Sequence, residues 1–389
     1  MNKKKSLLFV CYGLGIGGIE RCLVNLLNVL PEERYDVDLL ILNPEYAMLD
    51  KIRRKVRCLD AFTYTLNTEF TMKQMKAHGG IWKNKKKLLK YIDHRVRIKL
   101  GLPLWKTFES LEAHYDVAVA YSQNGLGPYY VIDKVSAGRK VLWYHNGAYA
   151  HTGRQYALDR QYYPQFDQVV TVSRDCQKML LDKFPILKDK LLVLRNICDA
   201  EDILKKSRAF RPDSFRTEGT HIVTVGRMSA EKGADLALEA CRQLLASGWN
   251  VIWHWVGDGP DAEAVAKKID QYGLNHYFLL EGNQDNPYPY IASAGIYVQP
   301  SFYEAYSTTV TEAKVLRRPI LVTDVGGMRD QLTDGVNGKI VPIAPDAIAQ
   351  GVAWLLEHEA EAGNMAKELK KECYQQEAVL REYEATVFH

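Results

Sequence analysis

Two carboxylates flank a short run of hydroxyl-bearing residues in the second half of the chain. Glu304 precedes Ser307, Thr308 and Thr309, and Glu312 follows them, eight positions after the first glutamate. If a helix begins near Ser307, Glu304 lies in the loop before it and Glu312 lies inside it. One carboxylate can then accept hydrogen bonds from sugar hydroxyls and the other from a ribose, while the N–H groups between them point at phosphate oxygens. A capped surface helix would show the same residues.

A loop with two cations precedes this segment in the sequence. Arg227 ends an apolar run and Lys232 follows it within residues 228–233, which lead into a helical pattern. A guanidinium and an ammonium near a helix N-terminus can clamp a diphosphate and neutralise the charge that grows as it departs. An exposed turn with two cations is the alternative.

The Gly-rich segment 13–18 follows the first apolar run and formally fits the spacing G-x-G-x-x-G. A dinucleotide site also needs an acidic residue at the end of the second strand, whereas Asp36 and Asp38 lie at its start. We therefore disfavour a nicotinamide site and read the aspartates as polar residues near a turn rather than metal ligands. The glycines either let an anion approach the N-terminus of a helix or simply make a tight turn.

The composition indicates a globular protein of about two domains, with 389 residues and 47% hydrophobic residues. The seven cysteines are scattered without a C-x-x-C pair, which suits a reducing cytosol and argues against disulfides or a zinc site. Lys3, Lys4 and Lys5 before an apolar run imitate a signal peptide, but the run is short and we expect a buried strand. No stretch approaches the ~20 apolar residues of a spanning helix.

Positive charge is concentrated in the first half. Residues 1–197 contain 32 Lys and Arg against 19 Asp and Glu, and the excess is greatest in segments 51–57 and 73–106. Aromatic and leucine residues interleave the second segment, as in surface helices that meet anionic lipid headgroups. A solvated helix face is the alternative. No nucleic-acid-binding module surrounds these segments, so nucleic acid is not an expected partner.

Short apolar runs alternate with helical patterns along the whole chain, which predicts parallel sheets covered by helices on both faces. A polar stretch at 198–218 interrupts this alternation, so we expect domains at 1–197 and 219–365, with a linker between them. The tail from Asp346 reads as two helices. The predicted strands are 7–12, 37–42, 117–121, 141–144, 169–172, 191–194, 221–225, 251–256, 277–280, 296–299, 319–323 and 339–341.

Taken together, these segments resemble the retaining glycosyltransferases of family four, which have the GT-B architecture. The features occur in the family's order: 17–20, 226–233, 256–260, 304–312, 326–327 and 334–338. The resemblance implies an α/β fold of two doubly wound, Rossmann-like domains facing a central cleft. It also implies an acceptor-binding first domain, a donor-binding second domain, and a C-terminal helix in 366–389 that packs back on the first domain.

The resemblance assigns roles to individual residues. Arg227 and Lys232 would hold the donor diphosphate, Glu304 the sugar hydroxyls and Glu312 the ribose. His145, after a predicted strand, matches the family's cleft histidine, although a histidine there is more often structural. The other matched donor-site positions are Gly17, Gly18, Asn196, Gly226, Gly282, Ser307, Thr308 and Thr309.

The expected reaction is transfer of a hexose or N-acetylhexosamine from a nucleotide diphosphate sugar, most simply UDP-linked, to a lipid-linked cell-surface glycan. No metal or other cofactor is expected, and the protein should lie on the inner face of the bacterial plasma membrane. A nucleotide-sugar epimerase and a non-catalytic sugar-nucleotide-binding module remain alternatives. The chain departs from the family at 305–307, where Phe-Gly is common, and at 328–330, where Glu is common, which puts donor identity in doubt.

Overall fold

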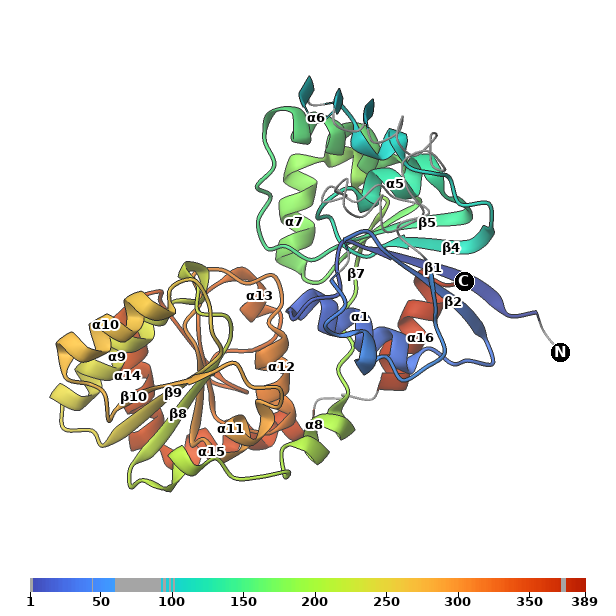
Figure 1. Ribbon diagram of the computed structural model, residues 1–389. Coiled ribbons are helices and arrows are strands. Elements are labelled where there is room, and N and C mark those ends of the chain that lie inside the picture. Colours follow the sequence, from blue (N-terminus) through green and yellow to red (C-terminus); the bar gives the residue numbers. More distant parts are fainter. Residues whose placement is uncertain are drawn as a thin grey trace, which may run out of the picture. The chain divides into compact units, whose positions relative to one another are not determined.

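The computed structural model describes residues 3–43, 45–59, 92–93, 96–97, 99–100, 102–371 and 376–389. The chain divides into two compact units, each built around one parallel sheet (Figure 1). Unit 1 comprises 1–172, 177–197 and 377–389, and unit 2 comprises 173–176 and 198–376. The α/β fold with two Rossmann-like sheets agrees with the sequence-based prediction.

The sheet of unit 1 has the strand order β3-β2-β1-β4-β5-β6-β7, and all its neighbouring strands pair in parallel. The apolar runs form its centre because both faces are covered, so a continuous hydrophobic strand is buried on each side. The strands are β1 (Lys5–Cys11), β2 (Tyr35–Ile41), β3 (Arg57–Leu59), β4 (His114–Ala120), β5 (Ser136–Tyr144), β6 (Gln168–Thr171) and β7 (Leu191–Val193).

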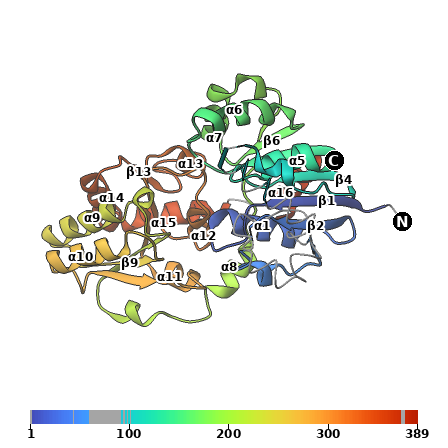
Figure 2. The same ribbon diagram turned by 45° about the horizontal axis from the view of Figure 1, so that its top comes forward.

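Helices cover both faces of this sheet, with α1 and α16 on one side and α5, α6 and α7 on the other (Figures 1 and 2). Their bounds are α1 (Gly18–Val29), α5 (Gly127–Lys134), α6 (Gly153–Tyr162), α7 (Arg174–Lys183) and α16 (Gln376–Thr386). Phe388, just after α16, packs against Phe9 of β1, and the Tyr383 hydroxyl donates to the carbonyl of Arg195. The C-terminal helix is therefore an integral part of unit 1.

Unit 2 has the strand order β10-β9-β8-β11-β12-β13, again with parallel neighbours. The strand that starts the unit thus lies inside the sheet, and the order reverses direction beside it, between β8 and β11. Ligands of open α/β sheets bind at the carboxyl ends of the strands at such a reversal. The strands are β8 (Thr220–Val225), β9 (Val251–Val256), β10 (Phe278–Gly282), β11 (Ile296–Gln299), β12 (Ile320–Thr323) and β13 (Lys339–Val341).

Two hydrophobic clusters fill the two faces of the second sheet. One face is covered by α9 (Ala234–Ala246), α10 (Ala262–Tyr272), α14 (Pro345–Glu357) and α15 (Glu359–Glu368). The opposite face is covered by α8 (Ala200–Lys206), α11 (Tyr288–Ser293), α12 (Thr308–Val315) and α13 (Gly326–Arg329). Short 3₁₀ turns, among them η6 (Asp213–Arg216) and η7 (Ala230–Lys232), connect several of these elements.

The structure differs from the sequence-based expectation in three places. The stretch 198–218, expected as a linker, folds with unit 2 as α8 and η6 and buries Ile203 and Phe215 in its core. The tail from Asp346 contains three α-helices (α14, α15 and α16) rather than two. Strand β3 was not predicted because it has only three residues, two of them exposed, and lies at the edge of the sheet.

Candidate functional site

The loop after β8 presents the two predicted cations of unit 2. The N–H of Gly226 donates to the Val256 carbonyl (3.0 Å), which extends the sheet into the loop. Arg227 then lies exposed, and Lys232 ends η7. Gly233 has φ +73°, and a Cβ there would lie 1.9 Å from the Pro300 carbonyl oxygen, so only glycine fits this turn. The turn carries the chain into α9 and sets Lys232 beside the loop after β11.

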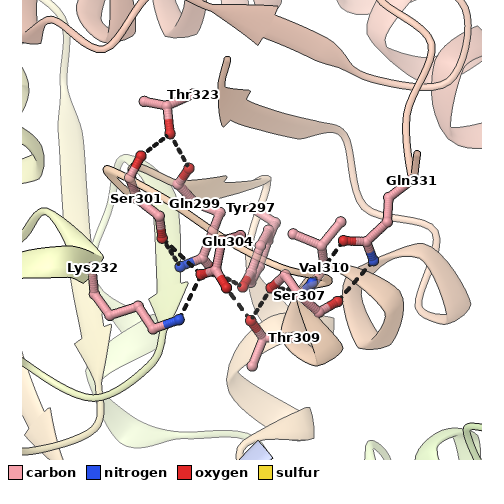
Figure 3. Close-up of polar contacts among 10 residues, drawn as sticks. All are labelled: Lys232, Tyr297, Gln299, Ser301, Glu304, Ser307, Thr309, Val310, Thr323 and Gln331. Atoms are coloured by element: carbon pink, nitrogen blue, oxygen red, sulfur yellow. Dashed lines mark hydrogen bonds and ion pairs between the residues drawn. The ribbon is translucent and has the colours of Figure 1, made fainter. Parts of the chain in front are cut away.

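Lys232 and Glu304 form an ion pair, with 2.6 Å between Nζ and Oε1 (Figure 3). Their side chains are only 25% and 9% exposed, so the pair is shielded from water on most sides. Ser301 also donates its hydroxyl to the same Glu304 oxygen, at 2.9 Å. The structure therefore joins two residues that are 72 positions apart. The sequence analysis assigned both to the donor site but did not predict that they pair with each other.

A row of buried polar side chains supports Glu304 (Figure 3). The Tyr297 hydroxyl donates to Gln299 Oε1 (2.6 Å), and Gln299 Nε2 donates to Ser301 Oγ (3.0 Å), which bonds Glu304. Gln299 is 1% exposed, and both of its side-chain polar atoms have partners, as a buried amide requires. The sequence analysis missed Tyr297, Gln299 and Ser301. The available signal was a glutamine at the end of the apolar run 296–299.

Helix α12 starts where the sequence predicted, with Ser307 as its N-cap. The Ser307 hydroxyl accepts from the Val310 N–H (3.3 Å). One expectation is wrong: the Ser307 N–H does not point toward an open site, because it donates to Gln331 Oε1 (2.8 Å). Gln331 Nε2 also donates back to the Ser307 carbonyl. In the described part of the chain, the N–H groups of Thr308 and Thr309 have no acceptor, and they mark the positive end of the helix.

Glu312 lies in the second turn of α12 and is 3% exposed. The Tyr288 hydroxyl donates to its Oε1 at 3.4 Å, so α11 and α12 meet at this carboxylate. Gly282 ends β10 with φ +66°, and its carbonyl accepts from the Gly257 N–H (2.8 Å). A Cβ on Gly257 would lie 2.1 Å from the Gly226 carbonyl oxygen, so the loops after β8, β9 and β10 stack through glycines. Unit 2 thus brings Gly226, Arg227, Lys232, Glu304, Thr308, Thr309 and Glu312 to the strand ends or the first turns of α12.

Unit 1 carries the remaining predicted residues. His145 directly follows β5 and is 7% exposed, with its ring tilted against Tyr121 and parallel to Trp143. The backbone N–H of His145 donates to Gln123 Oε1 (2.9 Å). Burial lowers the pKa of His145 from 6.5 to about 3, so the ring is neutral at pH 7. Within the described residues, neither His145 Nε2 nor Oδ1 of Asn196, which follows β7, has a hydrogen-bond partner.

The Gly-rich loop of unit 1 is bordered by carboxylates. Gly17 caps α1, and a Cβ on it would lie 2.2 Å from Glu20 Oε2. A Cβ on Gly15 would likewise lie 2.2 Å from Glu45 Oε1. The glycines at 17 and 18 thus open a helix as predicted, but negative side chains already lie at that helix N-terminus. This arrangement weakens the expectation that the loop attracts an anion.

Two family models match consecutive parts of the chain. Residues 16–202 match the model described as Glycosyltransferase Family 4, and residues 206–376 match Glycosyl transferases group 1. The chain therefore belongs to the GT-B glycosyltransferase family. The GT-B fold is shared with the Anabaena protein HepE, whose crystal structure holds UDP and glucose, with a TM-score of 0.73, 16% identity and 99% of each chain covered.

Curated relatives align with the glycosyltransferase over shorter lengths. The alpha-D-kanosaminyltransferase of Streptomyces kanamyceticus is 32% identical over 123 residues, covering 31% of this chain and 32% of that protein. A Campylobacter jejuni N-acetylgalactosaminyltransferase acting on a diphospho-undecaprenol glycan is 26% identical over 197 residues, covering 50% and 52%. The chain therefore spans between about a third and a half of the length of these relatives.

The basic segments of the glycosyltransferase are partly structural. In segment 51–57, Arg54 is buried and donates to the carbonyls of Leu30 and Tyr35 (2.8 Å each), and Arg57 binds Asp38. Most of segment 73–106 lies outside the described residues, but Lys106 pairs with Asp133 (2.6 Å). Segment 51–57 is therefore not a uniform cationic surface. Within the described part of the chain, no helix has both the length and the apolar character needed to cross a bilayer.

Proposed function

We propose that the protein transfers a hexose or N-acetylhexosamine from a UDP-sugar to a hydroxyl of a lipid-linked cell-surface glycan, with retention of anomeric configuration. The observation that carries the proposal is the Lys232–Glu304 pair beside the N-terminus of α12, with Arg227 exposed on the neighbouring loop. Two cations and two helix N–H groups supply positive charge for a diphosphate. A carboxylate between them supplies an acceptor for sugar hydroxyls.

The ion pair with Lys232 gives the two carboxylate oxygens of Glu304 different roles. Its Oε1 accepts from both Lys232 and Ser301, which fixes the orientation of the carboxylate. Oε2 remains to accept a hydrogen bond from a sugar hydroxyl. Lys232 meanwhile keeps its charge close to the position of the leaving diphosphate. The same carboxylate thus holds the lysine in place before the donor binds and orients the sugar afterwards.

The reaction we propose is attack from the face that the diphosphate leaves. The bond between the anomeric carbon and the phosphate oxygen breaks, and the bond to the acceptor oxygen forms. The acceptor's proton passes to an oxygen of the departing diphosphate. Arg227, Lys232 and the N–H groups of Thr308 and Thr309 stabilise the negative charge that develops on that group. The neutral His145 would orient the sugar through hydrogen bonding rather than by proton transfer, since its pKa lies far below 7.

No metal ion takes part in the proposed reaction. Arg227 and Lys232 would neutralise the diphosphate in its place. We therefore expect that chelation of divalent cations leaves turnover unchanged. A turnover rate that falls after EDTA treatment and returns with Mg²⁺ or Mn²⁺ would contradict this part of the proposal.

The choice of a lipid-linked acceptor draws on relatives whose names specify diphospho-undecaprenol and poly(ribitol-phosphate) substrates. It places the protein on the cytoplasmic face of the membrane, where the basic segment 73–106 would meet anionic lipids. Charge reversal of Lys85, Lys86 and Lys87, which lie outside the described residues, tests this placement. Binding to phosphatidylglycerol vesicles should fall in the variant, whereas equal binding would remove the membrane role.

Anomeric configuration gives the test of the proposed reaction. The protein is incubated with UDP-glucose or UDP-N-acetylglucosamine, and the free sugar released by slow donor hydrolysis is followed by ¹H NMR from the first minutes. Retention releases the α-anomer first, before it equilibrates in solution. Early release of the β-anomer would exclude a retaining reaction. The absence of UDP release from any UDP-sugar, with lipid-linked glycans present as acceptors, would exclude the donor class.

A further inference from the structure

Two buried histidines and a partly buried glutamate form a continuous row of polar contacts across the sheet of unit 2. His221 of β8, His254 of β9 and Glu281 of β10 lie on the face that packs against η6 and α11. His221 Nδ1 is 2.8 Å from His254 Nε2, and His254 Nδ1 is 2.8 Å from Glu281 Oε1. His254 is fully buried, and Phe215 stacks on its ring at 3.9 Å between centroids. The proposed catalytic site does not use these residues.

The hydrogen-bond geometry of His221, His254 and Glu281 determines how many protons these side chains hold together. His221 Nε2 lies 3.0 Å from the Thr217 carbonyl, which can only accept, so this nitrogen carries a proton. With a neutral His221, Nδ1 must accept and His254 Nε2 must donate. His254 Nδ1 then faces a carboxylate oxygen, and two acceptors cannot form a hydrogen bond without one further proton. The three groups therefore hold one proton more than two neutral rings and a carboxylate.

The groups around these three side chains favour the His254–Glu281 pair as the place of the extra proton. Burial lowers the pKa of His221, and the nearby charges of His254 and Arg211 act in the same direction. Burial by itself would raise the pKa of Glu281, but the interactions with His254 and Ser214 together outweigh it and lower the pKa. Tyr290, on α11, faces the same carboxylate, and burial together with the charge of Glu281 raises its pKa. The extra proton therefore lies between His254 Nδ1 and Glu281 Oε1, which are 2.8 Å apart.

This pair lies at the base of the loops that reach the donor site. Glu281 directly precedes Gly282, whose carbonyl accepts a hydrogen bond from the Gly257 N–H. The backbone carbonyl of Glu281 accepts from Gln284 Nε2 (2.7 Å). Asn283 Oδ1 accepts from the Asp258 N–H at 3.1 Å. Gly257 in turn packs against Gly226, the residue before Arg227. A shift of Glu281 would thus move the end of β10 and, through two glycine contacts, the loop that carries Arg227.

We propose that His254 and Glu281 are positioning residues that share one buried proton and thereby hold the loops after β8, β9 and β10 in the geometry that binds the nucleotide. The positioning role rests on the proposed function, whereas the shared proton does not. Deprotonation at high pH would leave a ring nitrogen facing a carboxylate inside the protein, so both stability and nucleotide affinity should fall there.

The substitution Glu281→Gln removes the need for the extra proton but keeps the size of the side chain. The glutamine amide has the same size and can donate to Nδ1 of a neutral His254, which completes the chain without the extra proton. The melting temperature of the unsubstituted protein should fall between pH 7 and pH 9.5 more steeply than that of E281Q. Glu263→Gln, which removes an exposed ion pair with Lys267 on α10, should instead follow the unsubstituted protein. Parallel curves for E281Q and the unsubstituted protein would overturn the shared proton.

Two further measurements complete the test. Ring-nitrogen NMR of the unsubstituted protein at pH 7 should show His254 Nε2 protonated and Nδ1 hydrogen-bonded through the proton that it shares with Glu281, and an Nδ1 without such a proton would refute the sharing even if E281Q fails to fold. Calorimetry with UDP should show an affinity that declines severalfold over the same pH range in the unsubstituted protein but not in E281Q. Equal declines would overturn the positioning role alone. No UDP binding at any pH would overturn the proposed function and the positioning role, whereas the nitrogen spectrum would still decide the shared proton.

Discussion

The two units present chemically different groups at the carboxyl ends of similar sheets. Unit 2 has an ion pair, Lys232–Glu304, on a buried polar chain, with Arg227 nearby. Unit 1 has a buried neutral imidazole (His145), the amide of Asn196, and a glycine-rich loop that borders carboxylates. Rossmann-like sheets thus supply the same scaffold, and the residues after each strand decide what it binds. In the proposed reaction, unit 2 would supply positive charge for the diphosphate, while His145 and Asn196 of unit 1 would offer uncharged hydrogen-bonding groups.

Removal of the positive charge of Lys232 should reduce the difference between the two units most strongly. Lys232→Ala should lower turnover by about a hundredfold or more, because the developing diphosphate charge loses a preorganised cation. It also leaves the Glu304 carboxylate, only 9% exposed, without its ion-pair partner. Steady-state UDP release measures the effect. Lys267→Ala on exposed α10 is the control, and equal rates in both variants would remove Lys232 from the mechanism.

The neutrality of His145 predicts a pH effect on stability. Its pKa is about 3 in the folded protein and about 6.5 when unfolded, so the unfolded chain binds the extra proton first. The stability that the neutral ring supports is full above pH 6.5 and is lost as the pH falls toward 3. At pH 5 the loss should reach up to about 2 kcal/mol. Urea denaturation should show it in the native protein but not in His145→Gln, and identical pH profiles would mean that the ring titrates normally.

The next substitution removes the buried side-chain amide of Gln299, which is linked to Glu304 through Ser301. Gln299→Leu deprives Tyr297, Ser301 and Thr309 of hydrogen-bond partners, at 2.6, 3.0 and 3.1 Å. Unsatisfied buried groups cost about 1–3 kcal/mol, so unfolding free energy should fall by that amount. The Michaelis constant for the donor should rise as well, because Glu304 loses its orientation. A variant that is destabilised but keeps wild-type donor kinetics would show that the chain serves only the fold.

The sequence predicted the second unit better than the first, for physical reasons. Strand positions followed from apolar runs buried on both faces. The Lys232–Glu304 pair was not predicted, because it depends on the pairing of β8 with β11. The roles of Gln331 and Gln299 could not be predicted, because a partner 24 or 10 positions away is chosen by tertiary packing. The same holds for Arg54 and Arg57, which looked like surface charge but bind carbonyls and Asp38. The carboxylates beside the Gly-rich loop also depend on how β1 and β2 meet.

The smallest expected effect concerns Ser307, whose N–H is bound by Gln331 rather than available to a ligand. Ser307→Ala removes the cap of α12 and should cost about 1 kcal/mol of unfolding free energy. Turnover should change little at saturating donor, since the N–H groups of Thr308 and Thr309 remain. Ser307→Asp keeps a capping oxygen but adds negative charge where the diphosphate would bind. Stability should therefore return in this variant while donor affinity drops. If both variants bind UDP equally well, the N-terminus of α12 does not hold the diphosphate, and the contrast between the two units rests on Arg227 and Lys232 alone.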